Sequence, residues 1–135
     1  MTALTQDRNT LRRDGHQVAL FVADATLIHA GAIVCVDANG MAVPGATSAT
    51  LRAVGVAERR ADNLASTGDV RVSCRKGPHK FANSAAADAV DTSDIGADCY
   101  IVDDQTVAKT NGTGTRSVAG KVFDVDADGV WVDFR

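Results

Sequence analysis

Apolar and polar residues alternate in short runs along most of this chain. The clearest run is Asp69–Arg75, in which Val and Cys alternate with Arg and Ser. A period of two places one set of side chains against a core and the other in solvent, which indicates a half-buried antiparallel strand. The segment Val130–Phe134 alternates as well and places Trp131 on the face opposite its other apolar residues. The pattern predicts many short strands and no long helix.

Two stretches of the chain follow the same order of strand, turn, strand, loop and strand. The first runs from Gly31 to Gly55 and the second from Gly96 to Gly120, so the offset is 65 residues at both ends. The alignment tolerates a slip of one residue near Arg52, and it leaves open whether the two copies arose by duplication or by convergence on common turn chemistry. A repeated β unit predicts a scaffold, with specificity carried by the unrepeated parts of the chain.

Composition supports the same fold class. The chain has 17 Val against 6 Leu, 16 of its 17 acidic residues are Asp, and it has 12 Gly. Val favours strands, whereas Asp and Gly favour turns. We therefore predict an all-β protein, a jelly-roll-like β-sandwich or barrel of short antiparallel strands. Residues 16–135 are expected to form a single β domain, and the polar, aperiodic residues 1–15 an extended N-terminal arm.

Charge is distributed unevenly along the chain, although the net charge is only −3. Residues 52–80 carry 7 basic and 3 acidic groups, and residues 81–135 carry 4 basic and 10 acidic groups. These charges either solvate two outer faces or complement a partner or a second copy of the chain. Aromatic residues make up 4% of the chain, too few for the stacking platform of a nucleic-acid binder. No apolar run is long enough to span a membrane, so neither nucleic acid nor a membrane is expected as a partner.

Candidate catalytic and metal-binding motifs are incomplete. The run Asp124-x-Asp126-x-Asp128-Gly129 matches the first half of a calcium loop, but Arg135 stands where the bidentate Glu belongs, so we predict a hairpin turn. The three histidines, His16, His29 and His79, are isolated in sequence, and Gly112–Gly114 lacks the lysine and helix of a phosphate loop. Cys35, Cys74 and Cys99 are expected to be reduced core residues, the first and last at nearly equivalent places in the repeat. No enzymatic activity, metal or cofactor is predicted.

The order and length of these segments resemble the small capsid cement, or decoration, proteins of Mu-like and related tailed phages and prophages. The resemblance covers most of the chain and is carried by Asp7-Arg8-Asn9-Thr10, Arg13-Asp14-Gly15, Ala30-Gly31-Ala32, Ala42-Val43-Pro44-Gly45, Val54-Gly55-Val56-Ala57-Glu58, Asp62-Asn63, Phe81-Ala82-Asn83-Ser84, Asp94-Ile95-Gly96, Tyr100-Ile101-Val102-Asp103-Asp104-Gln105-Thr106-Val107-Ala108 and Gly129-Val130-Trp131-Val132. No single motif among them is diagnostic.

The resemblance implies a structural virion protein, made in the bacterial cytoplasm, that binds the outside of the assembled capsid and bridges major capsid protein subunits. We expect the arm to order on the capsid, with Arg8, Arg12 and Arg13 pairing with acidic groups, and we expect a homodimer. Further interface candidates are Arg71, Arg75 and Trp131. Trp131 is either buried on a second face or an interface anchor. The alternative is a non-catalytic β-sandwich that binds a glycan or another host ligand.

Overall fold

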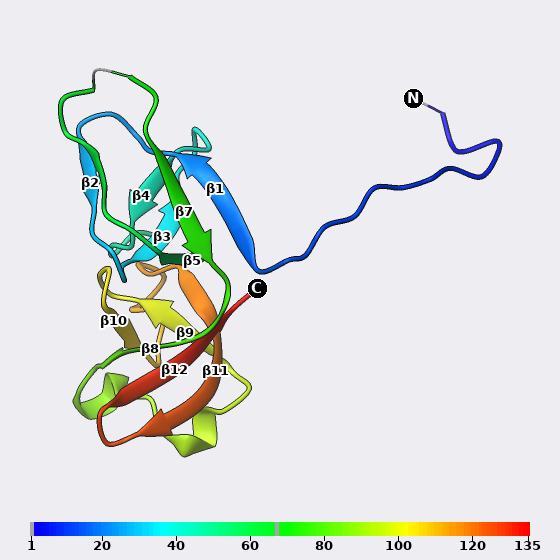
Figure 1. Cartoon of the computed structure of the whole chain (residues 1–135). Coiled ribbons are helices and arrows are strands. Elements are labelled where there is room, and N and C mark those ends of the chain that lie inside the picture. Colours follow the sequence, from blue (N-terminus) through cyan, green and yellow to red (C-terminus); the bar gives the residue numbers. More distant parts are fainter. Residues whose placement is uncertain (1, 67) are drawn as a thin grey trace.

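The computed structural model describes residues 2–66 and 68–135, and these residues form an all-β protein. Strands make up 46% of the chain and helix 5%, which confirms the predicted class. Two halves are stacked one above the other, a five-stranded sheet and a small closed barrel (Figure 1). A jelly-roll order within the all-β class is not confirmed.

The first half is a sheet with the strand order β1-β7-β5-β3-β4. Alternation predicted β7, and its Val72 and Cys74 are buried while Arg71, Ser73 and Arg75 are exposed. The strands are β1 (Gln17–Phe21), β3 (Ile33–Val36), β4 (Ala42–Pro44), β5 (Arg52–Ala57) and β7 (Arg71–Arg75), and β2 (Thr26–Ile28) pairs with β6 (Ala61–Asn63) in a separate ribbon.

The second half is a closed barrel with the order β10-β8-β12-β11-β9. The predicted turn lies at Asp126–Gly129, where Asp126 Oδ1 accepts from the backbone N–H groups of Asp128 and Gly129. β11 passes through Gly120 as one continuous strand with two register shifts. The elements are β8 (Gly77–Asn83), β9 (Asp98–Ile101), β10 (Thr106–Ala108), β11 (Val118–Asp126), β12 (Gly129–Phe134) and the short 3-10 helices η1 (Ala86–Asp88) and η2 (Thr92–Asp94).

The repeat is present in the strand register and is strict at 65 residues. Val34 faces Gly55 as Cys99 faces Gly120, and Cys35 faces Val43 as Tyr100 faces Ala108. A bulge falls at the same place in both copies, between Val34 and Cys35 and between Val118 and Gly120. The slip allowed by the sequence is therefore absent, and Cys99 corresponds to Val34 rather than to Cys35.

The repeat also extends beyond the two stretches seen in the sequence. β7 corresponds to β12, since Cys74 lies beside Ala57 as Val132 lies beside Val122. β1 corresponds to β8, which pairs with β12 as β1 pairs with β7. A single parallel bridge between Val22 and Ala42 joins the ends of the first sheet, at the place where Asn83 pairs with Val107 to close the barrel. The first half is thus a more open version of the second.

Gly55 and Gly120 occupy equivalent positions where two strands approach closely. A Cβ at Gly55 would lie 2.6 Å from the carbonyl oxygen of Arg75, and one at Gly120 would meet the carbonyl oxygen of Asp133. Both contacts are with backbone, which cannot move without displacing a strand. Glycine is therefore required at this position in both halves.

The two halves share an apolar boundary. One face of the first sheet carries Ile33, Cys35 and Val56 and packs against the barrel. These residues belong to the same buried cluster as the barrel interior. Backbone and side-chain hydrogen bonds cross the boundary, among them Ile33 N to Asp104 O at 2.9 Å and Thr47 Oγ1 to Val102 O at 2.7 Å. The first half keeps a separate interior around Ile28 and Val72.

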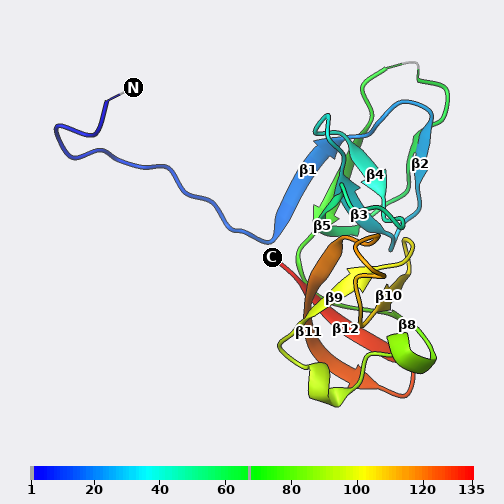
Figure 2. The same ribbon diagram turned by 180° about the vertical axis from the view of Figure 1, so that it is seen from behind.

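The N-terminal arm leaves the body at β1. Residues 2–15 are all exposed and run outward from the sheet in both views (Figures 1 and 2). The arm's placement agrees with the extended conformation expected for a polar, aperiodic segment. Over the described ranges, no helix has the length and apolar character needed to cross a membrane.

Candidate interaction surface

The arm places three of the predicted interface residues in solvent. Arg8, Arg12 and Arg13 are exposed, and so are Leu4 and Leu11, at 70% and 88%. Within the described residues, the arm forms no hydrogen bond or salt bridge with the body. Its backbone and side chains are therefore available to a partner.

Arg71 and Arg75 lie together on the outer face of β7, as the sequence predicted. β7 pairs with β1, so Arg71 lies opposite Phe21, and the Arg71 guanidinium carbon is 4.7 Å from the centre of the Phe21 ring. Beside them, Glu58 accepts hydrogen bonds from Gln17 Nε2 at 2.7 Å and from Ser73 Oγ at 3.3 Å. We call this surface of β1 and β7 the arginine face.

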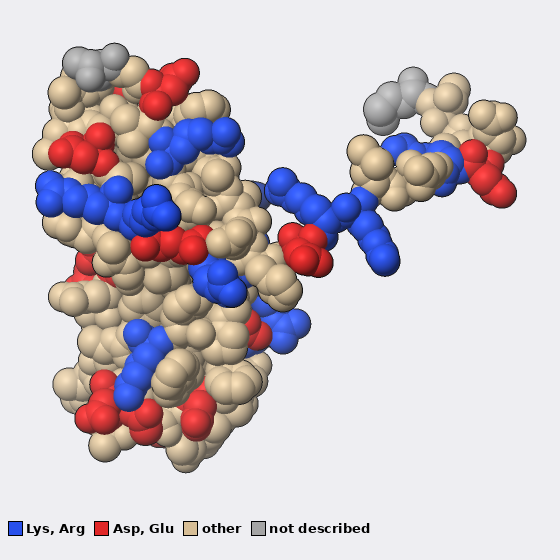
Figure 3. Space-filling model, in the orientation of Figure 1, with Lys and Arg blue, Asp and Glu red and all other residues tan. Residues whose placement is uncertain are grey.

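Further arginines adjoin the arginine face. Arg59, Arg60 and Arg71 line one hollow of about 450 Å³. Figure 3 shows groups of Lys and Arg side chains over the upper half of the body and along the arm, with Asp and Glu side chains between them. Sequence reasoning did not select Arg59 and Arg60, because they lie in an irregular segment whose position relative to β7 only the fold reveals.

Salt bridges are distributed unequally between the halves. Among the described residues, only the pair Arg60–Asp62, at 3.9 Å, lies in the first half. The other pairs involve residues 80–135, where Lys80, Lys109, Arg116, Lys121 and Arg135 each contact an aspartate. Seven arginines of the described chain have no such contact: Arg8, Arg12, Arg13, Arg52, Arg59, Arg71 and Arg75. In the described part of the chain, most arginines of the first half and arm therefore have no ion-pair partner, whereas most aspartates of the second half do.

Trp131 is separated from these arginines and lies on the barrel. It is half-buried on the outer face of β12, so of the two alternatives left open by the sequence, full burial on a second face does not hold. Its Nε1 donates to Asp126 Oδ2 at 3.3 Å, and Lys80 Nζ lies 5.9 Å from the ring centre. The backbone N–H of Asp128 and the Lys80 ammonium lower the pKa of Asp126 below its ordinary value. The Trp131 ring, the Asp126 carboxylate and the Lys80 ammonium thus form one local network of interactions.

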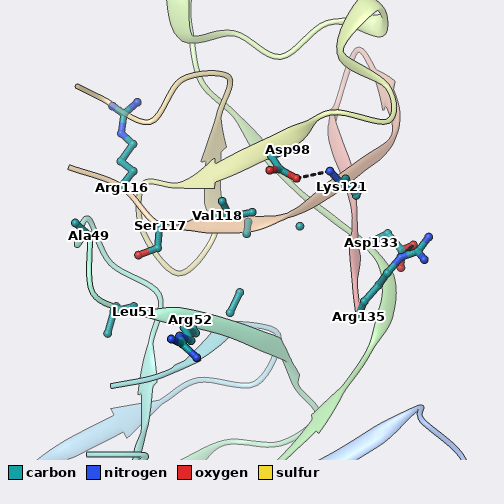
Figure 4. Close-up of a pocket in the computed structure, with 13 residues that line it drawn as sticks. Ala49, Leu51, Arg52, Asp98, Arg116, Ser117, Val118, Lys121, Asp133 and Arg135 are labelled. Atoms are coloured by element: carbon teal, nitrogen blue, oxygen red, sulfur yellow. Dashed lines mark hydrogen bonds and ion pairs between the residues drawn. The ribbon is translucent and has the colours of Figure 1, made fainter. Parts of the chain in front are cut away.

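A second hollow, of about 600 Å³, lies between β5 and β11 (Figure 4). Leu51 and Arg52 line one side, and Ser117 and Val118 line the other. Its acidic groups are paired, since Asp98 contacts Lys121 at 2.8 Å and Asp133 contacts Arg135 at 3.2 Å. Its lining includes neither Cys nor His, and the hydroxyl of Ser117 donates to the carbonyl of Ser48.

The cysteines are core residues, as predicted. Cys35, Cys74 and Cys99 are free and buried. Burial raises the pKa of Cys35 to about 12, of Cys74 to about 11 and of Cys99 to about 12, so their thiols are protonated at neutral pH. In residues 2–66 and 68–135, no group of three or more His, Cys, Asp or Glu is placed to hold a metal ion.

Two exposed apolar residues escaped the sequence analysis. Phe123 is 58% exposed and Ile95 is 49% exposed, and they line one shallow hollow on the barrel. The available signal was Val122-Phe123-Asp124, where the alternation of β11 is interrupted. Only the register shows that Phe123 turns outward there.

Comparison with known proteins does not identify the chain. No protein-family model, curated protein or solved structure matches it.

Proposed function

We propose that this protein decorates the outside of an assembled phage capsid and stabilises the shell by bridging major capsid protein subunits. The observation that carries the proposal is the set of seven arginines without an internal salt bridge, spread over the arm and the first half of the body. Exposed cations without an internal partner suit an acidic protein partner, because charge complementarity guides association and fixes orientation. The choice of a capsid as that partner follows the resemblance to cement proteins.

The arm and the arginine face are suited to contacting different subunits. A 14-residue extended segment reaches up to roughly 45–50 Å, which is enough to contact a neighbouring subunit. When arm and body hold separate subunits, opening the shell must break both contacts together. Binding to the assembled shell in preference to loose subunits then stabilises the shell by mass action. In this proposal the protein is a non-enzymatic component of the virion surface, made in the host cytoplasm.

Pelleting with purified empty shells tests the proposal. Wild-type protein should pellet with shells, less so as salt rises, because exposed charge pairs are screened. Deletion of residues 1–15 should abolish pelleting while the far-UV circular dichroism of the body is retained. Arg71→Gln/Arg75→Gln should weaken pelleting strongly.

The matched control is Gln105→Glu/Ala127→Glu, which gives the same net charge through exposed positions of the second half. It should pellet like wild type. Equal pelleting of the arginine variant and this control would remove the arginine face from the proposal. Failure of the wild-type protein to pellet would contradict the function itself.

Trp131 favours one alternative, a non-catalytic module that binds a glycan or another host ligand. Its ring lies on the outer face of β12 and is partly accessible. Glycan-array binding that is lost in Trp131→Ala, together with no shell binding, would support the alternative.

A further inference from the structure

Phe123 is exposed because of a β-bulge. β11 pairs with β12 through Val122 and Val132, and next through Asp124 and Trp131, so Phe123 has no partner opposite it. A bulge redirects the side chain of the extra residue and is a built feature rather than a defect. Here the exposed ring of Phe123 lines the same hollow as Ile95 and Val122. We call this surface the Phe123 face.

The repeat shows that the fold does not require an apolar residue at this position. In the first half Glu58 follows Ala57 without a bulge, and its backbone N–H donates to the carbonyl of Ser73, so the extra residue Phe123 has no counterpart there. The counterpart of Ile95, 65 positions earlier, is Ala30. Phe123 is therefore an addition of the second half, and Ile95 stands where the first half has a small residue.

The charges around the Phe123 face are matched. Lys121, Asp133 and Arg135 line both this hollow and the one between β5 and β11. Lys121 pairs with Asp98 at 2.8 Å, and Arg135 pairs with Asp133 at 3.2 Å. Such a rim has no excess charge of either sign, so two identical copies can meet there without net repulsion.

The arginine face has the opposite character. Phe21 is 44% exposed, but it lies beneath Arg71, and Arg71 and Arg75 have no salt bridge with any described residue. Two copies brought together at that face would juxtapose unpaired cations. Of these two exposed aromatic surfaces, only the Phe123 face suits contact with itself.

We propose that the Phe123 face is the contact surface for a second copy of this chain, in a symmetric dimer with Phe123 and Ile95 at its centre. An aromatic anchor within an apolar patch and a paired polar rim is the usual composition of such a contact. The arginine face and the arm remain outside this contact, so each dimer exposes two arginine faces and two arms. The inference does not depend on the identity of the acidic partner.

Sedimentation velocity over a concentration series tests the proposal. Wild-type protein should associate reversibly to a dimer, and Phe123→Ser should raise the dimer dissociation constant by about tenfold or more, as expected for a central anchor. Ile95→Ser is a second variant at the same face and should act in the same direction. Phe21→Ser is the matched control, because it makes the same substitution at an exposed ring of the arginine face. It should leave the dimer dissociation constant unchanged. Thermal melting checks that each variant is folded.

Three results would overturn the inference. A wild-type protein that stays monomeric over the series has no such contact. An unchanged constant in both Phe123→Ser and Ile95→Ser assigns the dimer to another surface. Loss of the dimer on deletion of residues 1–15, with Phe123→Ser unchanged, shows that the arm forms the contact. None of these measurements includes shells, so their failure is distinguishable from failure of the proposed function.

Discussion

Asp98 and Lys121 form a 2.8 Å ion pair at the positions that Ile33 and Val56 occupy in the other half of the molecule. In each half the two residues face one another across adjacent strands of the repeated unit. Ile33 and Val56 are buried, at 0% and 6% exposure, because the second half covers them. Asp98 and Lys121 line the hollow between β5 and β11 and are partly exposed, and there an ion pair replaces the apolar pair.

This relationship predicts unequal effects of substitution at equivalent sites. Ile33→Ala should lower the free energy of unfolding by about 2–5 kcal/mol, because it leaves a cavity at the boundary between the halves. Asp98→Ala should lower it by no more than about 1 kcal/mol, since the ion pair that it removes is partly solvated. Urea denaturation of both variants makes the comparison. Similar losses of unfolding free energy in the two variants would show that the surroundings of Ile33 and Asp98 do not differ as described.

The close approach at Gly55 and Gly120 predicts matched losses of stability. Gly55→Ala and Gly120→Ala each place a methyl group against a backbone carbonyl, so each should cost on the order of 1–3 kcal/mol of unfolding free energy. Gly15→Ala is the control, because a Cβ there meets nothing within 4 Å. Its stability should be unchanged or slightly raised. If Gly55→Ala or Gly120→Ala is as stable as Gly15→Ala, the two strands at that glycine do not approach as closely as described.

Cysteine reactivity tests the burial of the two cores. Because desolvation raises the pKa of Cys35, Cys74 and Cys99 to between about 11 and about 12, the thiolate population is negligible at pH 8. Ellman's reagent should therefore titrate no thiol in the native protein and all three in denaturant. Prompt reaction of one thiol in the native state would show that its core opens.

The sequence predicted the class, the terminal hairpin and part of the repeat, because these depend on local patterns. Alternation identified β7, and the residues Asp126–Gly129 identified the turn. The correspondence of β1 with β8 could not be seen in the sequence, since their side chains differ and only the shared register relates them.

The candidate interaction surface was less predictable than the fold. Arg71 and Arg75 were found because both lie on the polar face of one strand. Arg59 lies in an irregular segment, and its proximity to Arg71 is a product of tertiary structure. Phe123 was missed for a related reason, because its outward direction depends on a bulge that is defined by the partner strand.

The free arm predicts a specific pattern of proteolysis. With no hydrogen bond to the body among the described residues, it should be cut by trypsin at Arg8, Arg12 or Arg13 before the body is cut. Mass spectrometry of a time course identifies the first product. Saturating shells should slow these cuts if the arm orders on the capsid, and unchanged cleavage of shell-bound protein would exclude the arm from the contact.

The central claim is that the protein recognises an assembled shell rather than its loose subunits. The most direct measurement is a binding isotherm of labelled protein against two forms of the same major capsid protein, assembled shells and soluble subunits, at equal subunit concentration. We expect saturable binding to shells at a fixed ratio to capsid subunits, and much weaker binding to the soluble form. Equal binding to both forms, or binding to neither, would contradict the account.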